Sequence, residues 1–238
     1  MVEPAARFEE IRIPLVDPVH GLVDVAGVLG VPRWWPTGSR VGIVLAHDAG
    51  SNLSDPALEA LHQLLTEQRY LTLRFNFPFA EAKKKRVDDA PILRRALQSA
   101  VSVLARDPTA APAHLFVGGA GLGGQVAADL ATARTHVDGL FVLGYPLHPQ
   151  GRPEKARADH LYRVVAPLLF VQGTRDRRCD LDALRRTLKG VGAPRSLHIC
   201  DDADHRFRVT KRGARQQIDV YHELLVTLDS WIQKILGA

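Results

Sequence analysis

Apolar runs alternating with amphipathic stretches are the feature that most restricts the fold of this chain. Near-continuous apolar runs, such as VGIVLA at 41–46, end in polar or glycine-containing turns. The expected strands are 41–50, 70–78, 114–119, 137–146, 166–176 and 195–205, and the expected helices are 56–68, 90–106, 124–133, 180–190 and 216–236. Such alternation predicts an α/β fold, a mostly parallel sheet with helices on both faces.

Two leading segments differ from this pattern. Residues 7–15 and 21–32 alternate apolar and polar side chains, which is typical of half-buried antiparallel strands. We therefore expect an antiparallel N-terminal edge on the sheet. No Pro/Gly/Ser-rich linker divides the chain, so we expect one domain over 1–238.

The composition indicates in which compartment the protein works and which partners it can bind. Hydrophobic residues make up 46% and charged residues 24%, and neither a bilayer-spanning run nor a signal-peptide pattern is evident, so no membrane partner is expected. Two cysteines, Cys179 and Cys200, are too few for a disulfide scaffold and fit a reducing cytoplasm. The net charge of +5 permits an anionic partner, although a mild basic excess does not by itself predict nucleic-acid binding.

Ligands of such sheets bind at the carboxyl ends of the strands. The residues expected there are 47–50, 76–78, 119–124, Asp176 and His205. The stretch FVGGAGLGGQVAADLA, residues 116–131, is a strand, a glycine-rich turn and a helix start. This layout suits either a phosphate-binding loop or the elbow that carries a hydrolase nucleophile.

The phosphate-binding interpretation is the weaker one. Gly119, Gly121 and Gly124 match G-x-G-x-x-G. A dinucleotide site also needs an acidic residue at the end of the next strand, but that strand ends in Gly144 and Tyr145. We expect no cofactor and keep dinucleotide binding as a remote alternative.

The elbow interpretation fits order and context. An elbow needs small residues two positions before and after the nucleophile, and Gly119 and Gly123 supply them around position 121. An acid and then a histidine should follow later strands, as Asp176 and His205 do. Position 121 is glycine, so the nucleophile itself is missing.

Several linked motifs resemble a known family. They are LAHDAG, LRFNFPF, VGGAGLGG, GYPLHPQGRPEKARADHL, LLFVQGTRD and DADHRFRV, from about Val41 to the C-terminus. The chain resembles the small α/β-hydrolase-like proteins that include the testis-expressed hydrolase-like protein and the hydrolase-like subunit of the NSL acetyltransferase complex, relatives of dienelactone hydrolases. The resemblance implies an α/β-hydrolase fold, with acid and base roles for Asp176 and His205. The family's elbow reads G-G-(K/R)-S-M-G-G, whereas 118–124 reads GGAGLGG.

The loop expected to form the oxyanion hole also departs from the expected pattern. Its backbone N–H groups, from Asp48 or Ala49, would pair with that of Leu122. A carboxylate at Asp48 that faces the hole would repel a developing oxyanion, and one that points away would not. The sequence leaves both orientations open.

Other nucleophiles are poorly placed for this scaffold. Ser51, Cys179 and Cys200 are interpreted as ordinary loop and core side chains. A His205–Asp176 pair that activates water directly is the better alternative.

Basic residues surround the expected site. Arg175, Arg177 and Arg178 flank the acid, and the histidine is followed by Arg206, Arg208, Lys211 and Arg212. If the two loops meet, the mouth is cationic and favours an anionic ligand, with a solvated basic rim as the simpler interpretation. The short segment 147–165 leaves no room for a lid domain.

The leading hypothesis is a degenerate α/β-hydrolase-like protein that lacks serine-hydrolase turnover and binds a small anionic ligand or a protein partner. The alternatives are an active hydrolase in which His205 and Asp176 activate water, and a dinucleotide-binding protein.

Overall fold

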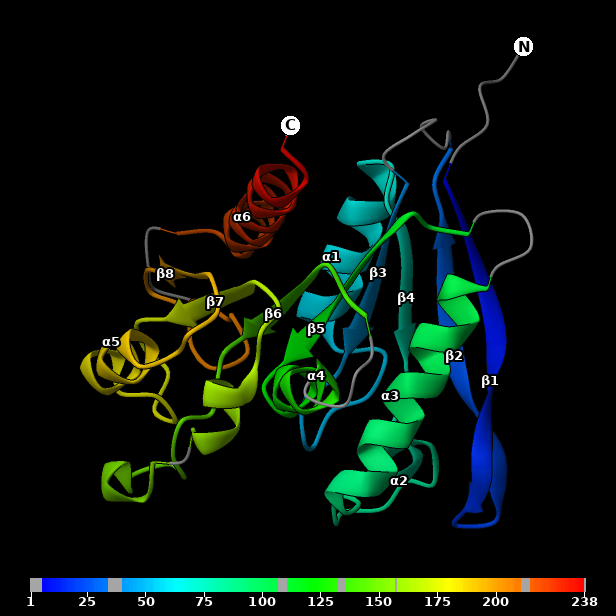
Figure 1. The fold of residues 1–238 in the computed structure, drawn as a ribbon, viewed down its shortest axis with the longest axis horizontal. Helices are drawn as coiled ribbons and strands as arrows, with labels where there is room; N and C mark the ends of the chain where they lie inside the picture. Colours follow the sequence, from blue (N-terminus) through cyan, green and yellow to red (C-terminus); the bar gives the residue numbers. More distant parts are fainter. Residues whose placement is uncertain are drawn as a thin grey trace.

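A single eight-stranded sheet forms the centre of the molecule (Figure 1). The computed structural model describes residues 6–33, 40–106, 111–131, 136–156, 158–210 and 215–237. The strands lie in the order β1-β2-β4-β3-β5-β6-β7-β8. Their bounds are β1 Arg7–Val19, β2 Leu22–Val31, β3 Val41–Ala46, β4 Leu71–Phe75, β5 His114–Ala120, β6 Gly139–Leu143, β7 Leu168–Gly173 and β8 Arg195–Cys200.

The sheet is parallel except at its N-terminal edge. β2 runs antiparallel to both β1 and β4, while β4, β3, β5, β6, β7 and β8 pair in parallel. The predicted antiparallel edge and parallel body are therefore confirmed. Every residue of β3 is buried, as expected for a central strand covered on both faces, whereas β1 is mostly exposed along the edge.

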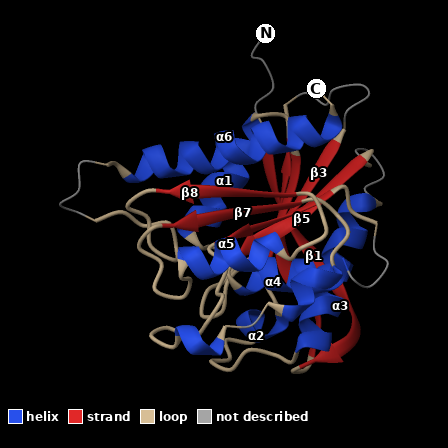
Figure 2. Ribbon diagram, turned by 60° about the vertical axis from the view of Figure 1, so that its left-hand side comes forward, coloured by secondary structure: helices blue, strands red, loops and turns tan. Residues whose placement is uncertain are grey.

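Helices cover both faces of the sheet (Figure 2). α1 (Pro56–Glu67) and α6 (Gln217–Leu236) pack on one face with a core that includes Phe116 and Trp231. α3 (Ala90–Ala105), α4 (Leu122–Ala131) and α5 (Leu181–Lys189) pack on the other, where Phe75 and Phe170 lie. All five helices coincide with predicted segments.

The elements that the sequence did not predict are short. α2 (Pro78–Glu81) follows β4, and two 3₁₀ turns, η1 (Pro153–Lys155) and η2 (Asp159–Arg163), lie between β6 and β7. These turns are the regular structure in the described part of that connection, which agrees with the predicted lack of a lid. Within the described residues, no helix combines the length and apolar character needed to cross a bilayer.

Close contact between α4 and β3 fixes the turn after β5. A Cβ at Gly123 would lie 2.3 Å from the Ala46 carbonyl oxygen, and a Cβ at Gly119 only 1.9 Å from that oxygen. Both distances are far below van der Waals contact, and both neighbours are backbone atoms that cannot rotate away. The two glycines that the elbow interpretation singled out are therefore required by packing.

We predict that Gly123→Ala lowers the free energy of unfolding by about 2 kcal/mol or more, because the methyl group must push α4 away from β3. Thermal unfolding followed by circular dichroism should show a melting temperature about 5 °C lower. Gly192→Ala is the matched control, since a Cβ there meets no atom within 4 Å. An unchanged melting temperature in Gly123→Ala would contradict the tight packing.

Candidate active site

The loops after β3, β7 and β8 bring three titratable side chains together. His205, in the loop after β8, contacts Asp176 through Nδ1 at 2.8 Å. Its other ring nitrogen, Nε2, lies 3.2 Å from Oδ2 of Asp48, in the loop after β3. Sequence reasoning expected the first contact, and the second places a carboxylate on each side of the imidazole.

Asp176 is held firmly in place. Its side chain is fully buried, and Oδ2 also accepts a hydrogen bond from Nε2 of Gln172 at 2.6 Å. The backbone N–H of Arg178 donates to Oδ1 at 2.8 Å. Gln172 is itself fixed, since its Oε1 accepts from the backbone N–H of Tyr145. With its acceptors filled in this way, the carboxylate orients the imidazole of His205.

The turn after β5 is the segment that the sequence predicted as an elbow, and glycine stands at its position 121. Gly121 sits at φ +47°, in the left-handed region that favours glycine. A Cβ at this position would lie 2.1 Å from Oδ1 and 2.5 Å from Cγ of Asp48. The Asp48 carboxylate thus fills the space that a side chain at the elbow would need.

The same carboxylate occupies the expected oxyanion hole. The backbone N–H of Leu122, at the start of α4, donates to Oδ1 of Asp48 at 2.8 Å. His47 ties this loop down, because its Nδ1 donates to the Asp48 carbonyl while its Nε2 accepts from the backbone N–H of Phe77. The orientation of Asp48 that the sequence left open is therefore inward. Ala49 lies beside it and lines the adjacent cavity with Leu122.

Asp48 and His205 each stabilise the charged form of the other. Burial opposes the charged form of Asp48, but hydrogen bonds from His205 and from the Leu122 N–H outweigh it and lower the pKa of that carboxyl. Burial likewise opposes a charged His205, yet Asp176 and Asp48 raise its pKa to about 9. At neutral pH the site therefore holds an imidazolium between two carboxylates.

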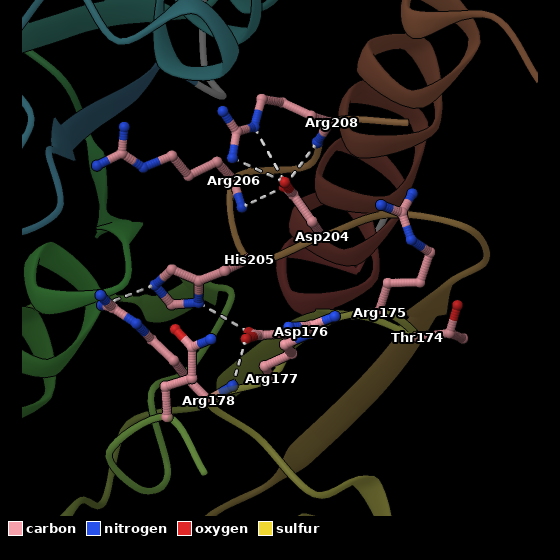
Figure 3. Close-up of a pocket in the computed structure, with 10 residues that line it drawn as sticks. Thr174, Arg175, Asp176, Arg177, Arg178, Asp204, His205, Arg206 and Arg208 are labelled. Carbon is pink, nitrogen blue, oxygen red and sulfur yellow. Dashed lines mark hydrogen bonds and ion pairs between the residues drawn. The ribbon is translucent and has the colours of Figure 1, made fainter. Parts of the chain in front are cut away.

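Arginine side chains surround the exposed side of this centre (Figure 3). The cavity measures about 600 Å³ and includes five arginines and two aspartates in its wall. Its lining is Gln150, Thr174, Arg175, Asp176, Arg177, Arg178, Asp204, His205, Arg206 and Arg208. The two predicted basic loops do meet, while Lys211 and Arg212 lie outside the described residues.

The arginines differ in how far they are engaged. Arg175 bonds to Asp202, Arg208 to Asp204, and Arg206 to the Gly50 carbonyl. Arg178 reaches inward, with Nη1 3.5 Å from Nε2 of His205 and 3.9 Å from Oδ2 of Asp48. Arg177 is exposed, and among the described residues nothing pairs with its guanidinium.

A second cavity adjoins the first at Arg178. It measures about 580 Å³ and has a more apolar wall, which includes Ala49, Leu122, Pro146 and Leu147. Asp48 also lines this cavity, so its carboxylate faces accessible space although its side chain is only 4% exposed.

The other candidate nucleophiles stand apart from this centre. Ser51 donates to Asp55. Cys179 and Cys200 are buried, and burial raises the pKa of both thiols. None of the three contacts His205 in the hydrogen bonds of the described residues.

Comparison with known proteins agrees with this fold. A family profile described as an alpha/beta hydrolase domain matches residues 39–233. The chain belongs to the α/β-hydrolase domain family. Similar folds include a dienelactone hydrolase from Anabaena variabilis (TM-score 0.69, 22% identity, 93% of this chain and 96% of that one). They also include a serine hydrolase without a lid from Xanthomonas campestris (0.68, 18%, 94% and 95%) and a Pyrococcus furiosus esterase (0.71, 16%, 96% and 90%).

Three features of this α/β-hydrolase site escaped sequence reasoning. The contact of Gln172 with Asp176 was not predicted, because nothing distinguishes a glutamine within an apolar strand from the rest of that strand. The inward position of Arg178 depends on the loop conformation. The packing role of Gly144 was not predicted either: a Cβ there would lie 2.6 Å from the His205 carbonyl oxygen, so this glycine makes room for the histidine loop.

We predict that the imidazolium stabilises the fold at neutral pH and ceases to do so in alkali. The pKa of His205 is raised from 6.5 to about 9, so its contribution is complete below pH 6.5 and is lost as the pH rises through 9. The loss is on the order of 3 kcal/mol. Urea unfolding from pH 6 to 9 should show this decline in the unmodified chain relative to His205→Gln. Parallel curves for the two proteins would refute the ion-paired histidine.

Proposed function

We propose that this chain is a hydrolase-fold protein that has lost serine-hydrolase turnover and binds an anionic ligand at its arginine-lined cavity. The observation that carries the proposal is the position of the Asp48 carboxylate, which fills the space at Gly121 and takes the Leu122 N–H. Both places belong to the reacting groups of an acyl-transfer site.

The first reason is chemical. Acyl transfer needs a nucleophile and N–H donors aimed at the oxygen that becomes negative. Gly121 has no side chain, and the Leu122 donor is already bound to a carboxylate oxygen. A substrate oxyanion would have to displace one negative charge in order to place another. The retained His205–Asp176 pair then lacks a partner to activate.

The finer family resemblance supports the same view. The chain resembles the small hydrolase-like proteins of the testis-expressed and NSL-subunit type through LAHDAG, VGGAGLGG and DADHRFRV, while it departs from them at the elbow serine. We propose that it is a degenerate member of that group.

The arginine-lined cavity supports the binding role. Five guanidinium groups face two carboxylates, and the His205 ring adds a further positive charge at neutral pH. Among the described residues, none pairs with the Arg177 guanidinium, so this group can bind an incoming oxygen anion. Guanidinium groups bind carboxylates and phosphates in a bidentate manner. A small molecule with such a group, or the acidic surface of a partner protein, suits this cavity.

The alternative of water activation is less favoured by the geometry. A general base must be unprotonated, yet the pKa of His205 is about 9 and its Nε2 is occupied by Asp48. Dinucleotide binding is disfavoured by the same carboxylate, which lies at the N-terminus of α4 where a pyrophosphate would bind.

We predict that restoring the serine alone fails and that a double change succeeds. Gly121→Ser places its Cβ 2.1 Å from Oδ1 of Asp48, so the side chain has no room to adopt a reactive position. Gly121→Ser combined with Asp48→Ala frees both the space and the Leu122 N–H. A fluorophosphonate probe, followed by intact-protein mass spectrometry, should label only the double variant.

The control is a panel of ester and thioester substrates given to the unmodified chain and to His205→Ala. Turnover by the unmodified chain that His205→Ala abolishes would overturn the proposal in favour of water activation. Labelling of the single variant Gly121→Ser would show that Asp48 does not block the elbow.

We predict that inorganic phosphate and citrate bind in the arginine-lined cavity. Arg177→Ala should raise the dissociation constant about tenfold, because a charged hydrogen bond is lost. Isothermal titration calorimetry measures this, with Arg195→Ala as the matched control on the exposed start of β8. Equal weakening in both variants would indicate only a general charge effect.

A further inference from the structure

We propose that the free edge of β1 pairs with β1 of a second copy of this chain, so that two sheets join in antiparallel fashion across a two-fold axis at Ile11. This interface is independent of the proposed function, because no residue of β1 lines the arginine-lined cavity. The partner is a copy of the same strand, and the backbone directions and the charges of β1 select it.

β1 is the outermost strand of the sheet, next to β2 (Figure 1). In the part of the chain that the structure describes, no strand pairs with its outer edge. The side chains from Arg7 to Glu10 are exposed, and so is that of Arg12. The unpaired N–H and C=O groups of such an edge can form a ladder with another extended strand.

A hydrogen bond of Asn76 shows which backbone groups of β1 point outward. The Asn76 N–H donates to the Ala26 carbonyl, so Ala26 bonds toward β4. Bonding directions alternate along a strand, so the odd-numbered residues of β2 bond toward β1, where their partners are also odd-numbered, as in the pair of Gly27 with Ile11. The even-numbered residues of β1 therefore face outward, and Pro14 agrees, since its nitrogen has no hydrogen to give to β2. The outward groups are those of Phe8, Glu10 and Arg12.

This alternation restricts how two copies of β1 can align. Outward residues must stand opposite outward residues, so even-numbered positions pair with even-numbered positions. One such register places Glu10 opposite Glu10 and another places Arg12 opposite Arg12, and like charges that stand opposite each other are destabilising. The register between these two places Glu10 opposite Arg12 on both sides of the axis, with Ile11 opposite Ile11. Registers further along shorten the ladder or reach the irregular segment 14–19.

The side chains of Glu10 and Arg12 are available for this contact. Glu10 is exposed and forms no ion pair among the described residues. Arg12 is half-exposed and gives four of its five N–H groups to Asp24 and Glu81, which hold the guanidinium on the sheet. The fifth N–H can donate to Glu10 of the second copy, so the ladder carries two symmetric ion pairs.

Phe8 and Ile11 add apolar contacts on the two faces of the joined sheet. Phe8 lies on the same face as α1, where its ring contacts His62, yet it is 44% exposed. In the selected register it stands opposite Pro14 of the second copy, and packing on that ring covers the exposed part. Ile11 faces the α3 side and meets its own counterpart at the axis.

The first measurement is the mass of the unmodified chain in solution. Sedimentation velocity over a concentration series should show a reversible equilibrium between 26.2 kDa and twice that mass. A ladder over residues 8–14 buries less than about 1,200 Å², so we expect a weak dimer with a micromolar dissociation constant. A chain that stays monomeric throughout the series would overturn the proposal.

Charge exchange tests the register. Glu10→Arg and Arg12→Glu each place like charges opposite one another, and each should raise the dissociation constant about tenfold or more. An equimolar mixture of the two variants should dimerise again, because every pair across the axis then has opposite signs. Glu9→Arg is the matched control, since it makes the same charge change on the opposite face, and it should alter the constant by less than about threefold. Variants that do not respond in this way would place the dimer on another surface and refute the proposal.

A second variant does not depend on charge. Glu10→Pro removes an outward N–H and leaves the bonds between β1 and β2 in place, so the folded chain should lose its dimer. Circular dichroism checks that this variant and Arg12→Glu remain folded. A folded Glu10→Pro chain that still dimerises as the unmodified chain does would contradict pairing along this edge.

A disulfide locates the axis directly. In the selected register the Ile11 pair is not hydrogen-bonded, which brings its Cα atoms to about 4.5 Å, within the range of a disulfide. Ile11→Cys should therefore form a covalent dimer on mild oxidation, while the buried Cys179 and Cys200 do not compete. Glu9→Cys is the control, because residue 9 would lie about 13 Å from its counterpart. Cross-linking at position 9 in preference to position 11 would refute this register. Phosphate binding in the arginine-lined cavity is measured separately, so failure of the dimer leaves the proposed function intact.

Discussion

An imidazolium held between two buried carboxylates is the interaction on which the architecture of this site depends. Asp48, Asp176 and His205 lie in loops that follow three different strands, β3, β7 and β8. Each loop on its own exposes polar groups at the sheet edge. The protonated ring joins them, because Nδ1–H donates to Asp176 and Nε2–H donates to Asp48. Burial makes an unpaired charge costly, so removal of any one member leaves the others unsatisfied. The same contacts that order the loops also keep His205 protonated. The ring therefore has no unprotonated nitrogen with which to act as a base at neutral pH.

The fold could be predicted from the sequence because its signals are local and repeated. Each central strand is a short apolar run such as VGIVLA, and each major helix has an apolar stripe, so the α/β layering follows from periodicity. The antiparallel edge was predictable because β1 and β2 alternate polar and apolar residues. Short elements such as α2 were missed, since four residues carry too little periodicity to be distinguished from a turn.

The site was predictable in its parts and only partly in its arrangement. Gly119, Gly123, Asp176 and His205 were singled out from spacing; in the structure Asp176 contacts His205, and both glycines pack against the backbone of Ala46. The direction of Asp48 was not predictable, because it depends on torsion angles in a loop that His47 and the Phe77 N–H fix from a neighbouring strand end. Likewise, the inward reach of Arg178 is determined by two distant loops, and no pattern within its own segment contains that information.

Gly121 and Asp48 must be understood as one feature. A side chain at position 121 and the observed carboxylate cannot both occupy the same space, since the Cβ and Oδ1 would be 2.1 Å apart. The glycine is therefore the condition that allows the carboxylate to reach the Leu122 N–H and His205. Without a side chain at position 121, the Asp48 carboxylate, from the loop after the neighbouring strand β3, fills the space beside Gly121. A single substitution at either position leaves a void or a clash, so their coupling can be measured only by changing both residues together.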